Sequence, residues 1–308
     1  MASEPQSALG TISRLSTRQP RSAVQRQRSV AAVMASPALA VIAVVSIVPL
    51  LAAAVFSFSK YDMFSAPRFI GVANYVSLFN DPVFWTAVRN TGTFAVSQVL
   101  IGMVVVVLVA LLLNQALHGG AAIRTIVYVP QAASYVVVAL AWNLLLDPVS
   151  GPLSQVVQQF TGQSLAVLTS STLAMPALVV VSLWRNLGYF MVIVLAALQS
   201  VPKELHEAAM VDGASAIRRF WAVTVPDIAP ALTFVAITWF LGSLQMFTQS
   251  FVMTQGGPVN ATRTVVYIMY DEAFLNLNIG KASAIAVLLF AVVVIIAAVL
   301  RLFGRRAS

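Results

Sequence analysis

The sequence predicts an all-α integral membrane protein with six transmembrane helices, and three observations lead to this fold class. Hydrophobic residues make up 59% of the 308 positions and charged residues only 9%, whereas soluble domains carry about 25% charged residues. The mean hydropathy is +0.89. Six apolar runs reach the roughly 20 residues that a helix needs to span a bilayer. A chain of this composition cannot cover a water-soluble core, so we expect it to reside in a membrane.

Residues 1–29 form the first segment, which is rich in Ser, Gln and Arg and has no apolar periodicity. We expect a disordered cytoplasmic tail whose arginines face anionic lipid. A signal peptide is the alternative interpretation, but the apolar run that follows is much longer than a hydrophobic signal region of about 7–15 residues. We therefore divide the chain into this basic tail and a membrane domain at residues 30–308.

The six predicted spans lie at about residues 33–58, 90–114, 123–146, 173–199, 229–253 and 281–303. Pro130 and Gln131 interrupt the third run near its start. Such interruptions persist in lipid where neighbouring helices or water satisfy the freed backbone groups. The third span is therefore expected to be buried in the bundle.

The distribution of Lys and Arg predicts that both termini lie in the cytoplasm. With that orientation the outer segments are 59–89, 147–172 and 254–280. The inner side carries twelve basic residues and the outer side carries five, one of which, Lys281, lies at the start of the sixth span. Short cytoplasmic loops usually hold the excess of Lys and Arg. The net charge of +8 then reflects this bias, and we expect no nucleic-acid partner.

The segment 202–230, here called the knuckle, is polar and lies between two apolar runs. Pro202 suits the first turn of a short helix, with Glu207 near its positive end. Gly213 can adopt the left-handed conformation that ends a helix, and Ser215 can cap a second short helix that ends near residue 223. Pro226 and Pro230 are expected to close the unit. These features predict a helix–turn–helix that projects from the membrane domain on its cytoplasmic side.

Two groups of polar residues lie inside predicted spans and are candidates for a hydrophilic path. Arg185, next to Asn186, is costly to bury, by at least about 2.5–3.5 kcal/mol on insertion scales. Arg185 either lines the path or has a structural role, in which backbone carbonyls or a partner permease accept its hydrogen bonds. In the fifth span, polar positions at spacings of four, three and four occupy one helical face: Thr238, Gly242, Gln245 and Gln249. They either line the path or hold helices together.

Several kinds of chemistry are absent from the sequence. There is no cysteine, which excludes disulfides, thiol nucleophiles and thiolate metal sites. The two histidines lie far apart, at His118 and His206, and no metal site is expected. There is no Gly-x-x-x-x-Gly-Lys-Ser/Thr loop to hold ATP phosphates, and no metalloprotease or hydrolase motif. We expect no catalytic residue and no cofactor in this chain.

The knuckle resembles the EAA loop of the permease subunits of bacterial type I ABC importers. The residues that fill this pattern, from Glu-Ala-Ala to the downstream Pro, are Glu207, Ala208, Ala209, Asp212, Gly213, Ala214, Ser215, Phe220 and Pro226. The version Pro-Lys-Glu-Leu…Glu-Ala-Ala…Asp-Gly-Ala-Ser is similar to the carbohydrate-uptake branch, whose members include maltose, trehalose and glycerol-phosphate importers. The patches at 142–148, 184–185, 196–202 and 254–262 extend the resemblance over roughly residues 35–303.

The resemblance implies the fold of a type I ABC importer permease, in which the knuckle is the cytoplasmic coupling helix. Its residues would then dock on an ATPase, with Glu207 at the position that pairs with a basic group. The implied partners are a second permease, two ATP-binding subunits and an extracytoplasmic solute-binding protein, in the bacterial cytoplasmic membrane. The implied substrate is a sugar or a sugar-like polyol, possibly phosphorylated.

Two other classes of protein remain as alternatives. A secondary transporter would tend to show inverted repeats and carboxylates inside its spans for ion coupling, and none of the predicted spans contains Asp or Glu. A membrane-embedded enzyme would need a catalytic constellation, and the sequence shows none.

Overall fold

The structure, a computed structural model, describes residues 21–115, 119–162 and 164–304. The chain divides into a first unit that ends at Ala52 and a second unit that begins at Ala53.

The first unit contains helix α1 (Arg21–Ile42), the π-helical turn η1 (Ala43–Ile47) and the start of α2 (Val48–Phe56). Val33–Phe56 is long and apolar enough to cross a membrane, which agrees with the first predicted span. Because α1 begins at Arg21, residues 21–29 are helical, and the prediction of a disordered tail is wrong for them. This stretch is rich in Arg and Gln, which are good helix formers, and it leads directly into the apolar run. Residues 1–20 of the predicted tail lie outside the described part.

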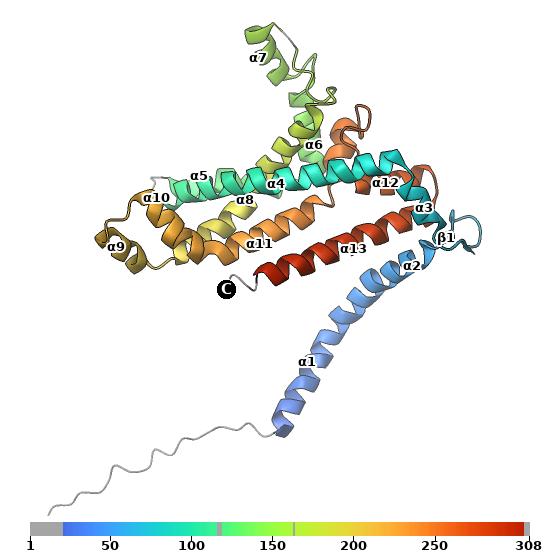
Figure 1. The fold of residues 1–308 in the computed structure, drawn as a ribbon, viewed down its shortest axis with the longest axis horizontal. Helices are drawn as coiled ribbons and strands as arrows, with labels where there is room; N and C mark the ends of the chain where they lie inside the picture. The colour runs from blue at the N-terminus through green and yellow to red at the C-terminus, as the bar shows by residue number, and fades with distance from the viewer. Residues whose placement is uncertain (1–20, 116–118, 163, 305–308) are drawn as a thin grey trace, which may run out of the picture. The chain divides into compact units, whose positions relative to one another are not determined.

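Four long helices form the core of the second unit (Figure 1): α4 (Pro82–Asn114), α8 (Ala174–Ser200), α11 (Val225–Ser243) and α13 (Ile279–Gly304). α4 packs against both α8 and α11. Val106, Ala110 and Leu113 are buried together at spacings of four and three, so one face of α4 supplies its share of the core. The described part of the chain contains five helices that could span a membrane, or six if a bent pair counts as one span.

The bent pair replaces the third predicted span. α5 (Gly120–Ala132) and α6 (Tyr135–Leu145) meet at an angle of 100°, so the run 123–146 is not one continuous helix. The hydroxyl of Ser134 accepts a hydrogen bond from the N–H of Val137 at 3.3 Å and caps α6. The break therefore lies just after the interruption that Pro130 and Gln131 indicate.

Two glycines let helices approach each other closely. A Cβ on Gly102 of α4 would overlap the indole ring of Trp239 from α11. A Cβ on Gly188 of α8 would overlap the backbone of α5 at Val127 and Tyr128. A side chain at either position would force these helices apart, so both contacts depend on the absence of a Cβ.

The short elements lie between the long helices. Ser59–Lys60 (β1) pairs antiparallel with Arg68–Phe69 (β2), and α3 (Ala73–Phe79) follows. The others are α7 (Pro152–Thr161), α9 (Lys203–Val211), α10 (Ala216–Arg219), η2 (Phe220–Thr224), η3 (Ser250–Thr254), α12 (Val265–Tyr270) and η4 (Asp271–Leu275). In the second unit, α9 and α10 lie at one end of the bundle, and α3 and α12 lie at the opposite end (Figure 1).

Candidate functional site

The knuckle begins as the sequence predicts, with two short helices joined by a tight turn. Gly213 adopts a φ of +74° just after α9. Its N–H donates to the carbonyl of Met210 at 3.0 Å, and the N–H of Ala214 donates to the carbonyl of Ala209 at 2.9 Å. This pair of hydrogen bonds is a Schellman motif, which satisfies carbonyls left free at the end of a helix. The turn is therefore fixed by local backbone geometry.

The second helix of the knuckle starts as predicted but does not end near residue 223. Ser215 caps α10 by accepting a hydrogen bond from the N–H of Arg218 at 3.4 Å. The helical segment then continues through η2 and α11 to Ser243. Pro226 lies in the first turn of α11 and Pro230 lies inside it. The π-helical turn directly before Pro226 widens the helix, which is one way in which a chain accommodates a residue that lacks an N–H.

The knuckle presents both acidic and apolar side chains to its surroundings. Glu207 and Asp212 are exposed, and no ion pair joins either of them to another described residue. Val211 is 89% exposed and Ile217 is 74% exposed. Phe220 is half-buried. An end of the bundle with unpaired carboxylates beside uncovered apolar side chains is suited to contact with another protein.

A cavity of about 290 Å³ lies where α8, α11, the α5–α6 break and the segment after α11 meet. Side-chain amides line it at Gln131, Asn186, Gln245 and Gln249. Hydroxyls line it at Thr238, Ser243 and Thr248. Aromatic rings complete most of the wall, at Phe94, Tyr135, Tyr189, Phe190, Trp239 and Phe247. The wall thus contains two kinds of surface. Its amides and hydroxyls can donate and accept hydrogen bonds, and its aromatic rings provide flat apolar surfaces.

The four polar positions predicted for the fifth span all line this cavity, but they do not lie on one regular helix. Thr238 and Gly242 belong to α11, which ends at Ser243. Gln245 follows in a turn, and Gln249 precedes η3. The prediction of a single helical face is therefore wrong, although the break directs all four positions to the same cavity.

Asn186 lines the cavity, whereas Arg185 is not among its lining residues. The guanidinium of Arg185 donates to the carbonyl of Ala133 through Nη2 at 3.0 Å and Nε at 3.3 Å. It also donates to the Gln131 carbonyl at 3.4 Å and to the Gln131 side-chain oxygen at 3.1 Å. Its carbon Cζ lies 3.7 Å from the centre of the Tyr135 ring. Arg185 thus satisfies carbonyls at the C-terminal end of α5, as the structural alternative predicts.

The polar groups of the cavity wall divide into two sets. The Tyr135 hydroxyl donates to Asn186 at 3.0 Å, and the Gln249 amide donates to the Ser182 hydroxyl at 3.1 Å. In contrast, the side chains of Thr238, Gln245, Thr248 and Tyr189 form no hydrogen bond with a described residue. The second set is free to bind a ligand.

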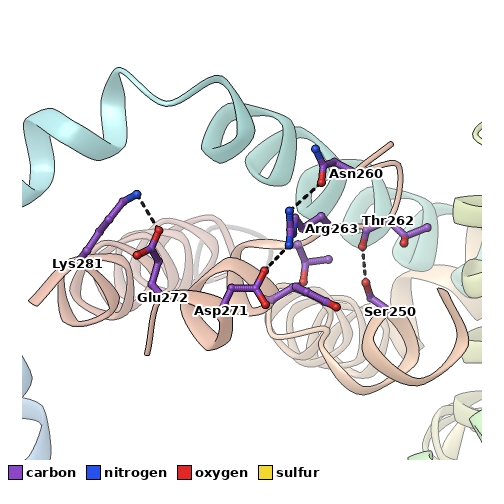
Figure 2. Close-up of polar contacts among 9 residues, drawn as sticks. Ser250, Asn260, Thr262, Arg263, Asp271, Glu272 and Lys281 are labelled. Carbon is purple, nitrogen blue, oxygen red and sulfur yellow. Dashed lines mark hydrogen bonds and ion pairs between the residues drawn. The ribbon is translucent and has the colours of Figure 1, made fainter. Parts of the chain in front are cut away.

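A polar cluster at the opposite end of the second unit was not predicted from the sequence (Figure 2). Arg263 forms an ion pair with Asp271 at 2.5 Å and donates to the side chain of Asn260 at 2.9 Å. Asn90 of α4 donates to the carbonyls of Asn260 and Arg263 at 2.8 and 2.9 Å. Burial raises the pKa of Asp271, although the charge of Arg263 opposes the shift. These contacts fasten the turn before α12 to α4.

The same cluster connects α13 to its neighbours. Lys281 forms ion pairs with Glu272 at 2.8 Å and with Asp81 at 3.6 Å. Ser250 donates to the carbonyl of Thr262 at 2.6 Å (Figure 2). The contacts of Asn90 with the turn before α12 and of Asp81 with Lys281 join residues far apart in sequence, so no local pattern could have identified them. Among the described residues there is no group of three or more His, Cys, Asp or Glu placed to hold a metal ion.

Comparisons with known proteins agree with this architecture. The model of the family described as "Binding-protein-dependent transport system inner membrane component" matches residues 102–308. The sn-glycerol-3-phosphate transport system permease protein UgpA of Brucella abortus biovar 1 (strain 9-941) is 32% identical over 247 residues, which cover 79% of this chain and 83% of that protein. The probable ABC transporter permease protein YurN of Bacillus subtilis (strain 168) is 33% identical over 245 residues, 78% of this chain and 84% of that protein.

A solved structure supports the same fold. The bacterial alginate ABC transporter, crystallised in complex with an alginate pentasaccharide-bound periplasmic protein, contains a chain that superposes with a TM-score of 0.81 at 22% identity. The match covers 92% of this chain and 96% of that chain. With the family match and the relatives above, the conclusion is that the chain belongs to the family of binding-protein-dependent transport system inner membrane components and is a multi-pass permease subunit of an ABC importer in the inner membrane.

Proposed function

We propose that this chain forms half of the translocation path of an importer for a sugar or a sugar-like polyol. The relative UgpA is named for sn-glycerol-3-phosphate. Another relative, the probable permease protein AmyD of Thermoanaerobacterium thermosulfurigenes, which is 29% identical, is named for starch degradation products. Both are polyhydroxylated compounds. The observation that carries the proposal is the cavity, whose free amide and hydroxyl groups lie beside aromatic rings. Polar groups placed in a mostly apolar pocket are typical of ligand sites.

The energy for transport comes from partner chains in this proposal. Two ATP-binding subunits bind and hydrolyse ATP, a second permease completes the path, and an extracytoplasmic binding protein delivers the substrate. The knuckle docks on an ATPase subunit through Glu207, Gly213 and the exposed apolar residues Val211 and Ile217. An unpaired carboxylate beside uncovered apolar side chains supports this assignment, because both gain partners when the complex assembles.

The knuckle faces the cytoplasm in this proposal, and both termini lie on the same side. The twelve-to-five distribution of basic residues supports this orientation. The turn at 254–264 and helix α7 then lie on the outer side, where the binding protein approaches.

The experiment combines two knuckle variants with a matched control for each. At Gly213 a Cβ meets nothing within 4 Å, so Gly213→Val acts only through its positive φ, at a cost of about 1–2 kcal/mol. Gly162, at the end of α7, has a φ of +73° and equally open surroundings, so Gly162→Val imposes the same strain elsewhere. Glu207→Ala is paired with Glu204→Ala on the same helix.

We expect all four variants to reach the membrane at near-normal levels. Gly213→Val and Glu207→Ala should lose most uptake and retain less ATPase subunit during purification, while both controls retain uptake and the ATPase subunit. Normal uptake by both knuckle variants would show that the knuckle does not couple ATP hydrolysis to transport.

A further inference from the structure

We propose that the cavity accepts an uncharged, polyhydroxylated ligand and discriminates against phosphorylated ones. The inference rests on the proposed role of the cavity in the translocation path and specifies the substrate class within that role. Sugars and sugar phosphates share hydroxyl groups, but they differ in the charge that a binding site must neutralise.

The described part of the cavity wall carries no charged side chain. Among its described lining residues there is no Asp, Glu, Lys, Arg or His. Amide and hydroxyl side chains each donate and accept hydrogen bonds, and the hydroxyls of a sugar do the same. A phosphate group only accepts, and proteins usually meet it with Arg, Lys or converging backbone N–H groups. The wall therefore matches a neutral polyol.

Arg185, a cation in contact with the cavity wall, is already engaged by other groups. Its guanidinium already binds the carbonyls of Ala133 and Gln131, and its face lies on the ring of Tyr135. Its Nη1 also donates to the side-chain oxygens of Gln131 and Asn186, at 3.1 and 3.3 Å. A phosphate could recruit this charge only by displacing these amides or the α5 carbonyls, which would then lose their partner.

The aromatic rings of the wall are placed to contact a sugar. Trp239 is only 2% exposed and stacks on Phe190 with ring centres 4.3 Å apart, so these two rings form a closed part of the wall. Tyr189 is 39% exposed and its hydroxyl has no partner among the described residues. An exposed ring with a free polar end can cover the apolar C–H face of a sugar while it binds a hydroxyl.

The test uses the natural absence of cysteine. Thr248→Cys places a single thiol in the cavity wall, and the assembled importer carrying it is purified in nanodiscs. The rate of maleimide labelling is measured with glycerol, maltose or trehalose, and with sn-glycerol 3-phosphate at matched ionic strength. Val259→Cys, at a position that is 92% exposed and does not line the cavity, reports effects on the reagent itself.

We expect at least one neutral probe to slow labelling of Thr248→Cys by about threefold or more, while sn-glycerol 3-phosphate has no effect beyond that on Val259→Cys. Equal or better protection by sn-glycerol 3-phosphate would overturn the proposal, and so would protection by neither class. These outcomes differ from a failure of the proposed function, which appears as normal uptake by the knuckle variants.

A pair of substitutions at Gln245 gives a second measurement. Gln245→Lys and Gln245→Glu add opposite charges at a lining position, and a neutral ligand should lose protection to a similar extent with both. An anionic ligand would bind the Lys variant at least about tenfold more tightly than the Glu variant, because unit charges a few ångströms apart interact strongly in a partly dry site. That difference would also refute the proposal. Gln158→Lys and Gln158→Glu, on the exposed side of α7, serve as controls.

Discussion

Arg185→Leu is expected to weaken the α5–α6 break and to distort the cavity wall indirectly. The side chain donates to two backbone carbonyls, those of Ala133 and Gln131. Hydrogen bonds to charged groups contribute about 1.5–3 kcal/mol in soluble proteins, whereas those between membrane helices average about 0.6 kcal/mol. Because both carbonyls lose their partner, we expect a total cost of about 2 kcal/mol, which corresponds to about a 30-fold change in an equilibrium constant.

The assay measures thermal denaturation of the detergent-solubilised complex and uptake kinetics in the same preparation. Arg185→Leu should lower the denaturation midpoint and also reduce uptake, since Gln131 and Tyr135 lose the group that positions them. Arg185→Lys keeps the charge but lacks the planar fork that serves two carbonyls, so it should lie between the wild type and the Leu variant. Arg68→Leu, at an exposed position on β2, controls for the loss of an arginine as such.

An Arg185→Leu complex with an unchanged denaturation midpoint and abolished uptake would contradict this structural role. That result would mean that Arg185 contacts the substrate directly, and that its bonds to the α5 carbonyls contribute little to stability.

Three further predictions concern other parts of the chain. Gly102→Ala should destabilise the complex by about 1–3 kcal/mol because the new Cβ overlaps Trp239, whereas Gly92→Ala, in open space on the same helix, should be neutral or stabilising by about 0.5–1 kcal/mol; thermal denaturation compares the two. An impermeant maleimide applied outside the cell should label Val259→Cys and leave Ser215→Cys unlabelled, and the reverse pattern would invert the topology. Burial raises the pKa of Asp271 in the folded state, so Asp271 should stabilise the fold less once the pH exceeds the pKa that this carboxyl has in the unfolded chain. The denaturation midpoint of the wild type, relative to that of Asp271→Asn, should therefore decrease as the pH is raised from 4 to 7. An increase would contradict this sign.

The sequence is most informative where structure is set by neighbouring residues. The turn at Gly213 could be predicted because a left-handed glycine and a capping serine act within a few residues of each other. The apolar runs located the spans for the same reason, since the length needed to cross a bilayer is a local property of the chain. The bend after Pro130 was also indicated locally.

The parts that sequence reasoning missed depend on contacts between distant segments. Gly242 is the one local signal near the end of α11, because Leu244 to Phe247, where the turn lies, contain neither Gly nor Pro. The turn is held from a distance, because the hydroxyl of Thr264 donates to the carbonyl of Met246 at 2.8 Å. The sequence likewise left two roles open for Arg185, because the carbonyls that it contacts lie more than fifty residues away, at the end of α5. The prediction that the second helix of the knuckle ends near residue 223, before Pro226 and Pro230, is wrong, because the π-helical turn before these prolines allows the helix to continue.

The unbroken helical segment from Ala216 to Ser243 has a mechanical consequence. It begins at the Ser215 cap in the knuckle, and its last turns carry Thr238 and Gly242 at the cavity wall. At 1.5 Å per residue, the Ser215 cap and Gly242 are about 40 Å apart along the helix axis. A rod of that length that pivots by about 5° at one end moves its other end by about 3.5 Å. A small rotation of the knuckle is thus enough to shift two cavity-lining positions by the width of an atom, without any change in the secondary structure between them.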